Sequence, residues 1–149
     1  MAQAIARRIE RHGGAALVID YGSAVAEPGD SLQALHRHEK QHALAAPGAA
    51  DLTAHVDFAA IARAVRDAGI ACHGPVTQAA FLDRLGIRER ADRLAAGADA
   101  RQRGDIEAAL ARLLGAREMG TLFKALAMVP RNAPVPAGFA SDEGPRPAR

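Results

Sequence analysis

Asp20 and Tyr21 are the first polar residues after the apolar segment Ala15–Ile19, and their types could orient a substrate. The segment is short, continuously apolar and bounded by glycine, which is typical of a buried strand in a parallel sheet. In open α/β sheets, ligands bind just beyond the carboxyl ends of the strands. An acid and a phenol there would face the crevice. The alternative is that Asp20 only accepts backbone N–H groups in a tight turn after the strand.

A second polar cluster, DLTAHVDF at residues 51–58, contains His55 and Asp57 and directly precedes a predicted helix. Helix N-termini favour anions, and polar side chains there can point into a cleft. His55 and Asp57 are therefore candidate site residues. The alternative is that Asp57 caps the helix by accepting first-turn N–H groups, while His55 is merely exposed.

Residues 38–42, HEKQH, match the zinc-protease pattern H-E-x-x-H. On a helix, His38 and His42 would share one face and could bind Zn²⁺, with Glu39 as general base and His36 or His55 as a third ligand. However, the two central residues of the motif are charged or polar, so the segment has little apolar stripe to bury. We interpret it as a solvated, His-rich segment and predict no metal site.

Cys72 and His73 could in principle form a nucleophile pair, but neighbours on a strand point to opposite faces, which favours a structural role. Cys72 is the only cysteine, so an internal disulfide is excluded and a reducing cytoplasm is the simplest compartment.

The composition excludes several classes of protein. The chain is 49% hydrophobic and 24% charged, as is usual for a globular domain, and its formal net charge of +2 is too small to indicate nucleic-acid binding. No apolar stretch is long enough to cross a membrane, and the charged, amphipathic N-terminal segment is unlike a secretory signal. The Ala- and Arg-rich usage is associated with GC-rich bacterial genomes.

Hydrophobic periodicity predicts strands that alternate with helices, which indicates an α/β sheet. Predicted strands cover residues 15–19, 70–76 and 121–129. Predicted helices cover residues 1–12, a segment from Asp57 to Ala68, a segment from Thr77 to Leu85, and two segments around Leu94 and around Ile106–Leu113. The polar residues 23–53 are expected to form an irregular excursion, with a short helix from Ser31. Residues 130–149 hold five of the eight prolines and are expected to be an extended or disordered tail after a domain of residues 1–129.

Several blocks of sequence together resemble one protein family. They are AALVIDYG at 15–22, GDSLQA at 29–34, DLTAHVDF at 51–58, GPVTQ at 74–78 with the FL and LGI that follow, MG at 119–120 with LFK at 122–124, and PAGF at 136–139. In this order they resemble the MidA-type class I S-adenosylmethionine (SAM)-dependent methyltransferases, relatives of the mitochondrial complex I assembly arginine methyltransferase. The resemblance extends over nearly all of the chain up to Phe139.

The resemblance implies the C-terminal half of a Rossmann-like class I methyltransferase fold. The three predicted strands would be the fifth, sixth and antiparallel seventh strands of that fold, and residues 23–53 a substrate-side insertion. The first strand would then lack neighbours, and its exposed edge could associate with another chain.

The same resemblance places the cofactor-binding residues upstream of Met1. The Gly-rich SAM loop and the acid that binds the ribose belong to the first half of such a fold, and indeed no G-x-G turn follows a predicted strand here. A Gly-rich methyltransferase motif encoded in frame before Met1 would make Met1 an internal methionine of a longer protein.

The implied activity is transfer of the SAM methyl group to an arginine nitrogen of a protein substrate. Asp20, Tyr21, His55 and Asp57 would line the acceptor side. We expect the chain to be inactive alone, because most of the SAM site would be missing. Two alternatives stay open at this point: a non-catalytic partner-binding module, and a zinc hydrolase built on His38, Glu39 and His42.

Metal analysis can test the zinc-hydrolase alternative, which we do not expect to hold. We expect protein purified without chelator to contain no stoichiometric zinc when metal content is measured by atomic emission. About one equivalent of zinc per chain, lost in both His38→Ala and His42→Ala, would instead support the hydrolase.

Overall fold

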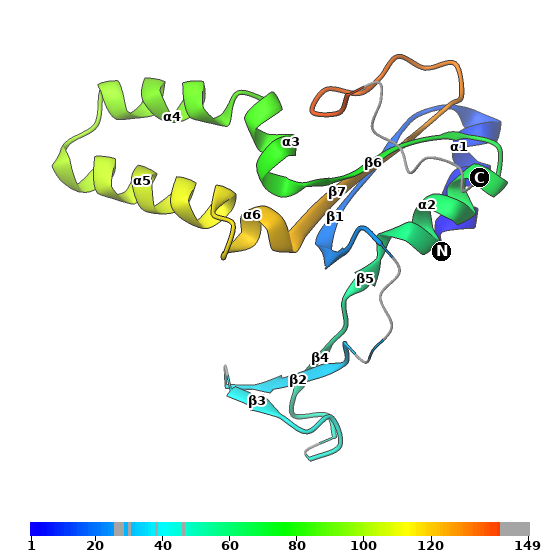
Figure 1. The fold of residues 1–149 in the computed structure, drawn as a ribbon, viewed down its shortest axis with the longest axis horizontal. Helices are drawn as coiled ribbons and strands as arrows, with labels where there is room; N and C mark the ends of the chain where they lie inside the picture. Colours follow the sequence, from blue (N-terminus) through cyan, green and yellow to red (C-terminus); the bar gives the residue numbers. More distant parts are fainter. Residues whose placement is uncertain (26–28, 30, 38, 46, 141–149) are drawn as a thin grey trace.

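A computed structural model describes residues 1–25, 29, 31–37, 39–45 and 47–140. Figure 1 shows a central sheet with helices on it, a helical hairpin on one side and a small β-arm below. The elements in chain order are α1 (Ala2–His12), β1 (Ala16–Ser23), β2 (Gln33–His36), β3 (Glu39–Gln41), β4 (Asp51–Thr53), β5 (Val56–Asp57), α2 (Phe58–Asp67), β6 (Ala71–Thr77), α3 (Gln78–Arg84), α4 (Ile87–Ala96), α5 (Ala100–Leu114), α6 (Met119–Leu122) and β7 (Phe123–Val129).

The central sheet has the strand order β5-β1-β7-β6. Strand β7 runs antiparallel to both of its neighbours, and its pairing with β1 extends from Ala16 opposite Met128 to Tyr21 opposite Phe123. This confirms the expectation that the last predicted strand is antiparallel. The structure adds that this strand lies between the two other predicted strands. The α/β class and the architecture of the C-terminal part of a class I methyltransferase fold are therefore present.

Helices α1 and α2 cover one face of this sheet. Their apolar residues recur at helical spacing, so that each helix presents one stripe to the strands. The largest fully buried side chains of this core are Phe58, Val65, Leu126 and Met128. Burial of side chains of this size stabilises the fold by roughly 1.5–3 kcal/mol each, so this layer is the main source of stability.

The opposite face is covered unevenly. Over β6 and β7, Phe81 of α3 and Phe139 pack on Val76, Ala125 and Ala127. Over β1, in contrast, Leu17 and Ile19 remain 52% and 46% exposed. The apolar strand predicted at residues 15–19 is therefore covered on one face within the described residues, in line with the expectation that it lacks neighbours in this chain.

The outer edge of β1 is also largely open. Strand β5 pairs with it in parallel, but only at Gly22 and Ser23. The close crossing explains the glycine, since a Cβ atom at position 22 would lie 2.1 Å from the carbonyl oxygen of Val56. Along most of its length, β1 thus has a single hydrogen-bonded neighbour among the described residues.

The short helix expected from Ser31 is wrong. Residues Gln33–His36 form β2, which pairs antiparallel with β3 and β4 in a separate small sheet. Arg37 adopts a positive φ of 53°, so the chain turns back after β2 instead of continuing into a helix. This β-arm (β2, β3 and β4) leaves the body at the end of β1 and returns at β5 (Figure 1).

The last predicted strand begins later than expected. Residues Met119–Leu122 form the short helix α6, and the strand starts at Phe123. Gly120 allows this turn to pack closely, because a Cβ atom there would lie 2.2 Å from the carbonyl oxygen of Leu114. Helix and strand propensities do not report a close backbone contact of this kind, so the sequence does not predict the short helix.

The remaining helices agree with the prediction. Helices α4 and α5 form a hairpin that projects from the body (Figure 1), and the buried Gln78 side chain donates to the Leu113 carbonyl oxygen at 2.9 Å. Residues 130–140 contain turns and no helix or strand, and residues 141–149 lie outside the described part. The domain boundary at residue 129 stays a prediction. No helix among the described residues is long and apolar enough to cross a membrane.

Candidate functional site

Three rings meet where β1, β5 and β7 come together. The Tyr21 ring lies 5.9 Å from the His55 ring and 5.6 Å from the Phe123 ring, both between centroids, in edge-to-face arrangements. His55 is exposed, whereas Tyr21 and Phe123 are half-buried. We call Tyr21, His55 and Phe123 the aromatic cluster. The structure thus brings two of the predicted site residues together, and adds Phe123.

The sheet register holds the cluster in place. Tyr21 lies directly opposite Phe123 in the β1–β7 ladder, and directly opposed residues of an antiparallel pair share one face. His55 immediately precedes β5, which crosses β1 at Gly22, one residue beyond Tyr21. The His55 backbone N–H also donates to Ser31 Oγ at 3.0 Å, which ties it to the start of the β-arm.

Asp20 does not lie in an exit turn, because β1 continues through Ser23. As its neighbour on a strand, it points to the face opposite Tyr21, beside Lys124 in register. Its Oδ1 accepts the Tyr21 backbone N–H at 2.8 Å, and Oδ2 has no hydrogen-bond partner within the described residues. The Lys124 ammonium donates to the carbonyl oxygens of Thr121 and Leu122.

Asp57 is the N-cap of α2. Its Oδ1 accepts the Ala60 backbone N–H at 2.8 Å, which satisfies one of the free donors of the first helical turn. The capping interpretation therefore describes what this carboxylate does in the structure, and its exposed position at the end of β5 leaves it at the rim of the strand-end region.

The zinc motif does not form a helix. Glu39–Gln41 is strand β3, so the helical spacing on which the hydrolase interpretation depended is wrong; His38 lies outside the described residues. His36 Nδ1 lies 2.6 Å from the Ala49 carbonyl oxygen, which gives this ring a structural partner. Within the described residues, no group of three His, Cys, Asp or Glu side chains could hold a metal ion.

Cys72 and His73 point to opposite faces of β6, as predicted. Cys72 packs against the core under α1 and α2, while the His73 ring lies 6.4 Å from the Phe139 ring on the other face. Burial raises the pKa of the Cys72 thiol from 9.0 to about 11, against a smaller lowering by Arg66. A thiol of this kind is a poor nucleophile at neutral pH.

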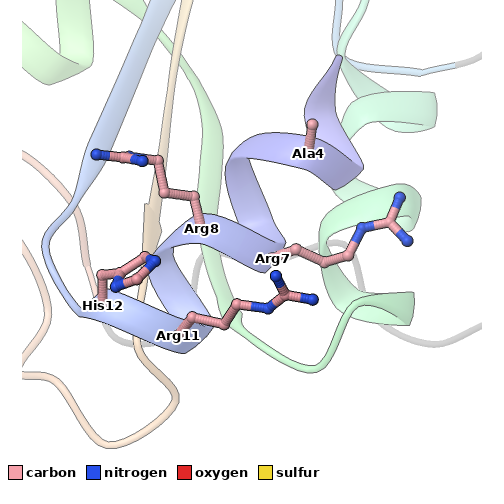
Figure 2. A pocket seen from close by; sticks show the side chains of 5 residues that line it. All are labelled: Ala4, Arg7, Arg8, Arg11 and His12. Carbon is pink, nitrogen blue, oxygen red and sulfur yellow. The ribbon is translucent and has the colours of Figure 1, made fainter.

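A basic groove of about 420 Å³ is lined by residues of α1 and by no residue of the aromatic cluster. Arg7, Arg8, Arg11 and His12 surround Ala4, with Arg8 on one side of the helix as drawn and Arg7 and Arg11 on the other (Figure 2). Arg11 and His12 lie in the last turn of α1. Cations near a helix C-terminus interact favourably with the helix dipole, which is a sufficient structural role for these two residues.

Comparison with known proteins decides the family. Residues 1–76, just over half of the chain, match the family described as "Putative S-adenosyl-L-methionine-dependent methyltransferase". This chain belongs to that methyltransferase family. The resemblance to MidA-type methyltransferases that the sequence blocks predict is thereby confirmed, and SAM is the methyl donor of the family.

Relatives and solved structures agree with this assignment. The mitochondrial protein arginine methyltransferase NDUFAF7 homolog of Drosophila melanogaster is 40% identical over 85% of this methyltransferase chain, and NDUFAF7 of Xenopus tropicalis is 37% identical over 92%. A Burkholderia thailandensis protein, solved bound to S-adenosyl-homocysteine, superposes on 96% of the chain with a TM-score of 0.80 at 30% identity. The chain spans only 29% and 33% of the two relatives and 39% of the solved protein.

The described residues of this methyltransferase chain do not by themselves form a cradle for SAM. A nucleotide-like cofactor needs a glycine-rich turn after a strand, where backbone N–H groups can approach it. The glycine at the end of β1, Gly22, faces the Val56 backbone at close range instead, and β6 leads directly into α3.

Met1 immediately precedes helix α1 in this methyltransferase chain. It is the N-cap of α1, where its carbonyl oxygen accepts the Ala4 backbone N–H at 2.9 Å, and the residue is 97% exposed. Its side chain makes no capping hydrogen bond. The expectation that the cofactor-binding residues lie upstream of Met1 stays a prediction.

The raised pKa of Cys72 can be tested by alkylation. At pH 8 the folded methyltransferase chain should react with iodoacetamide roughly 100-fold more slowly than the same chain in urea, because a shift of about two pKa units lowers the thiolate fraction by that factor. The folded state also holds this proton more tightly, so the free energy of unfolding should fall as the pH rises from about 9 toward 11. Equal alkylation rates would contradict the burial.

Proposed function

We propose that this chain forms the acceptor side of a SAM-dependent methyltransferase that modifies arginine side chains of a protein. The observation that carries the proposal is the position of the aromatic cluster, at the carboxyl end of a strand in the methyltransferase sheet, where open α/β sheets bind their ligands. The names of the relatives, protein arginine methyltransferases, support the choice of acceptor.

In methyl transfer from SAM, the protein mainly positions the two reactants and forms no covalent bond with them. SAM supplies an electrophilic methyl group, and the enzyme must align the acceptor nitrogen with it and hold the acceptor still. In our proposal Tyr21 and His55 contact the acceptor. Asp20 adds negative charge at the same strand end from the opposite face of β1, and Asp57 fixes the start of α2 and the return of the β-arm.

We further propose that the uncovered side of β1 docks the portion of the methyltransferase fold that this chain does not span. Leu17 and Ile19 are half-exposed there, and an apolar hollow of about 210 Å³ lies beside Leu17, bounded by Phe81 and Phe139. The solved relative carries more than half of its length outside the matched region, so it has chain enough to cover this face. Activity of the chain alone should accordingly be absent.

A non-catalytic partner-binding module is the second candidate. The same open face favours it, because an unpaired strand edge beside apolar side chains can bind any chain that adds a strand. The two candidates differ in outcome, since only the enzyme gains methyl transfer when the missing portion is supplied. A cytoplasmic location stays part of the proposal, although the relatives are named mitochondrial.

Methyl transfer can be tested by complementation. Residues 1–149, co-expressed with the part of the Burkholderia thailandensis protein that they do not cover, should transfer labelled methyl from SAM to an arginine peptide, while residues 1–149 alone should not. His55→Ala should lower kcat/KM about tenfold or more, because it removes a ring that contacts the acceptor, and Asp20→Asn should lower kcat/KM to a similar extent, because it removes the negative charge at the same strand end. His42→Ala, an exposed histidine on the β-arm side, is the matched control. Parental activity in both variants would refute the site.

The docking face makes a separate prediction. Ile19→Lys should weaken capture of the complementary portion by at least tenfold in a pull-down titration, because a cation replaces an apolar side chain at the covered interface. Leu94→Lys, at a residue of similar exposure on α4, should leave capture unchanged. If both variants bind like the parent, β1 is not the docking strand.

A further inference from the structure

We infer that the aromatic cluster binds the guanidinium group of the acceptor arginine through cation–π contacts, with Phe123 as a specificity-determining residue. This inference rests on the proposed function, and it names the chemistry by which the same site selects its substrate. A planar, weakly hydrated guanidinium stacks on aromatic faces better than a compact ammonium does.

The distribution of aromatic residues is the first argument. The chain has four phenylalanines, one tyrosine and no tryptophan. Phe58 belongs to the core under α1 and α2, and Phe81 and Phe139 belong to the core on the other face. The two others, Tyr21 and Phe123, belong to neither core and lie together at the strand end. Packing of the described cores therefore does not account for them.

The geometry of the rings is the second argument. The His55 and Phe123 rings stand at 75° and 76° to the Tyr21 ring, so ring faces point in more than one direction. An exposed histidine and two half-buried rings keep contact with solvent, unlike a closed aromatic core. A flat cation that enters from solvent can therefore lie over the face of one of these rings, which is what cation–π recognition needs.

Charge around the cluster is compatible with a cation. Asp20 precedes Tyr21 at the same strand end and points to the opposite face of β1, and its Oδ2 has no hydrogen-bond partner within the described residues. The Lys124 ammonium is directed to the carbonyl oxygens of Thr121 and Leu122, and Lys124 lies opposite Asp20 on the other face from the rings. The basic groove lies on α1 and not at this end of the sheet.

The chain offers a direct optical readout. Tyr21 is the only tyrosine, and there is no tryptophan, so tyrosine emission reports on this cluster alone. The probe is an acetylated and amidated Gly-Arg-Gly peptide, and the control ligand is the same peptide with citrulline, which keeps the shape and removes the charge. Titration of residues 1–149 should give a saturable change in emission with the arginine peptide and none with the citrulline peptide.

Substitutions then test the individual rings. Phe123→Leu keeps apolar volume and removes the ring, and it should weaken arginine-peptide binding roughly threefold. Phe123→Tyr, measured by calorimetry because it adds a fluorophore, should restore binding. His55→Leu at the exposed position repeats the test without disturbing the sheet, and His42→Ala should bind like the parent. Thermal melts of every variant show whether it is folded.

The outcomes separate this inference from the proposed function. Equal responses to arginine and citrulline peptides, no response to either, or parental binding by both Phe123→Leu and His55→Leu would overturn the inference, even if the complemented enzyme methylates arginine. Charge-selective binding that needs the rings would support it, even if the complemented enzyme proved to lack methyl transfer and the proposed function failed.

Discussion

The antiparallel ladder between β1 and β7 is the interaction on which the rest of the structure depends. It joins segments from opposite ends of the described chain through six opposed pairs, from Ala16–Met128 to Tyr21–Phe123. Because side chains alternate along a strand, this register places Val18 and Leu126 toward α1 and α2, and Tyr21 and Phe123 on the other face. A slip of β1 by one residue would move each of its side chains to the other face of the sheet. Asp20 would then leave the face that it shares with Lys124, and Tyr21 would no longer lie beside Phe123.

Much of the fold could be predicted because its strongest signals are local. The apolar runs predict β1 and β6, helical spacing predicts α1 and α2, and the Asp57 and Thr77 caps mark helix starts that the structure confirms. The order of the sequence blocks predicts the family. These features depend on residues within a few positions of one another, where propensity and capping chemistry act directly.

What could not be predicted depends on contacts between distant segments. The β-arm consists of strands of three or four residues in a polar region, which carry no clear alternation and become strands only by pairing with each other. The extension of β1 to Ser23 depends on β5 crossing at Gly22. The helix α6 depends on a nearer contact, the close approach of Gly120 to Leu114, which residue propensities do not report. For the site, Tyr21 and His55 stand out by type and position, whereas Phe123 looks like one more apolar strand residue until the ladder places it beside Tyr21.

The same ladder also determines when the central sheet can form during translation. Strand β1 leaves the ribosome well before β7, its only long partner among the described residues. Contacts between such distant segments form slowly, because the intervening chain must first be closed into a loop. Until β7 has been made, the apolar residues of β1, Leu17 and Ile19 among them, lack this antiparallel neighbour, and unpaired apolar strands of this kind are prone to association.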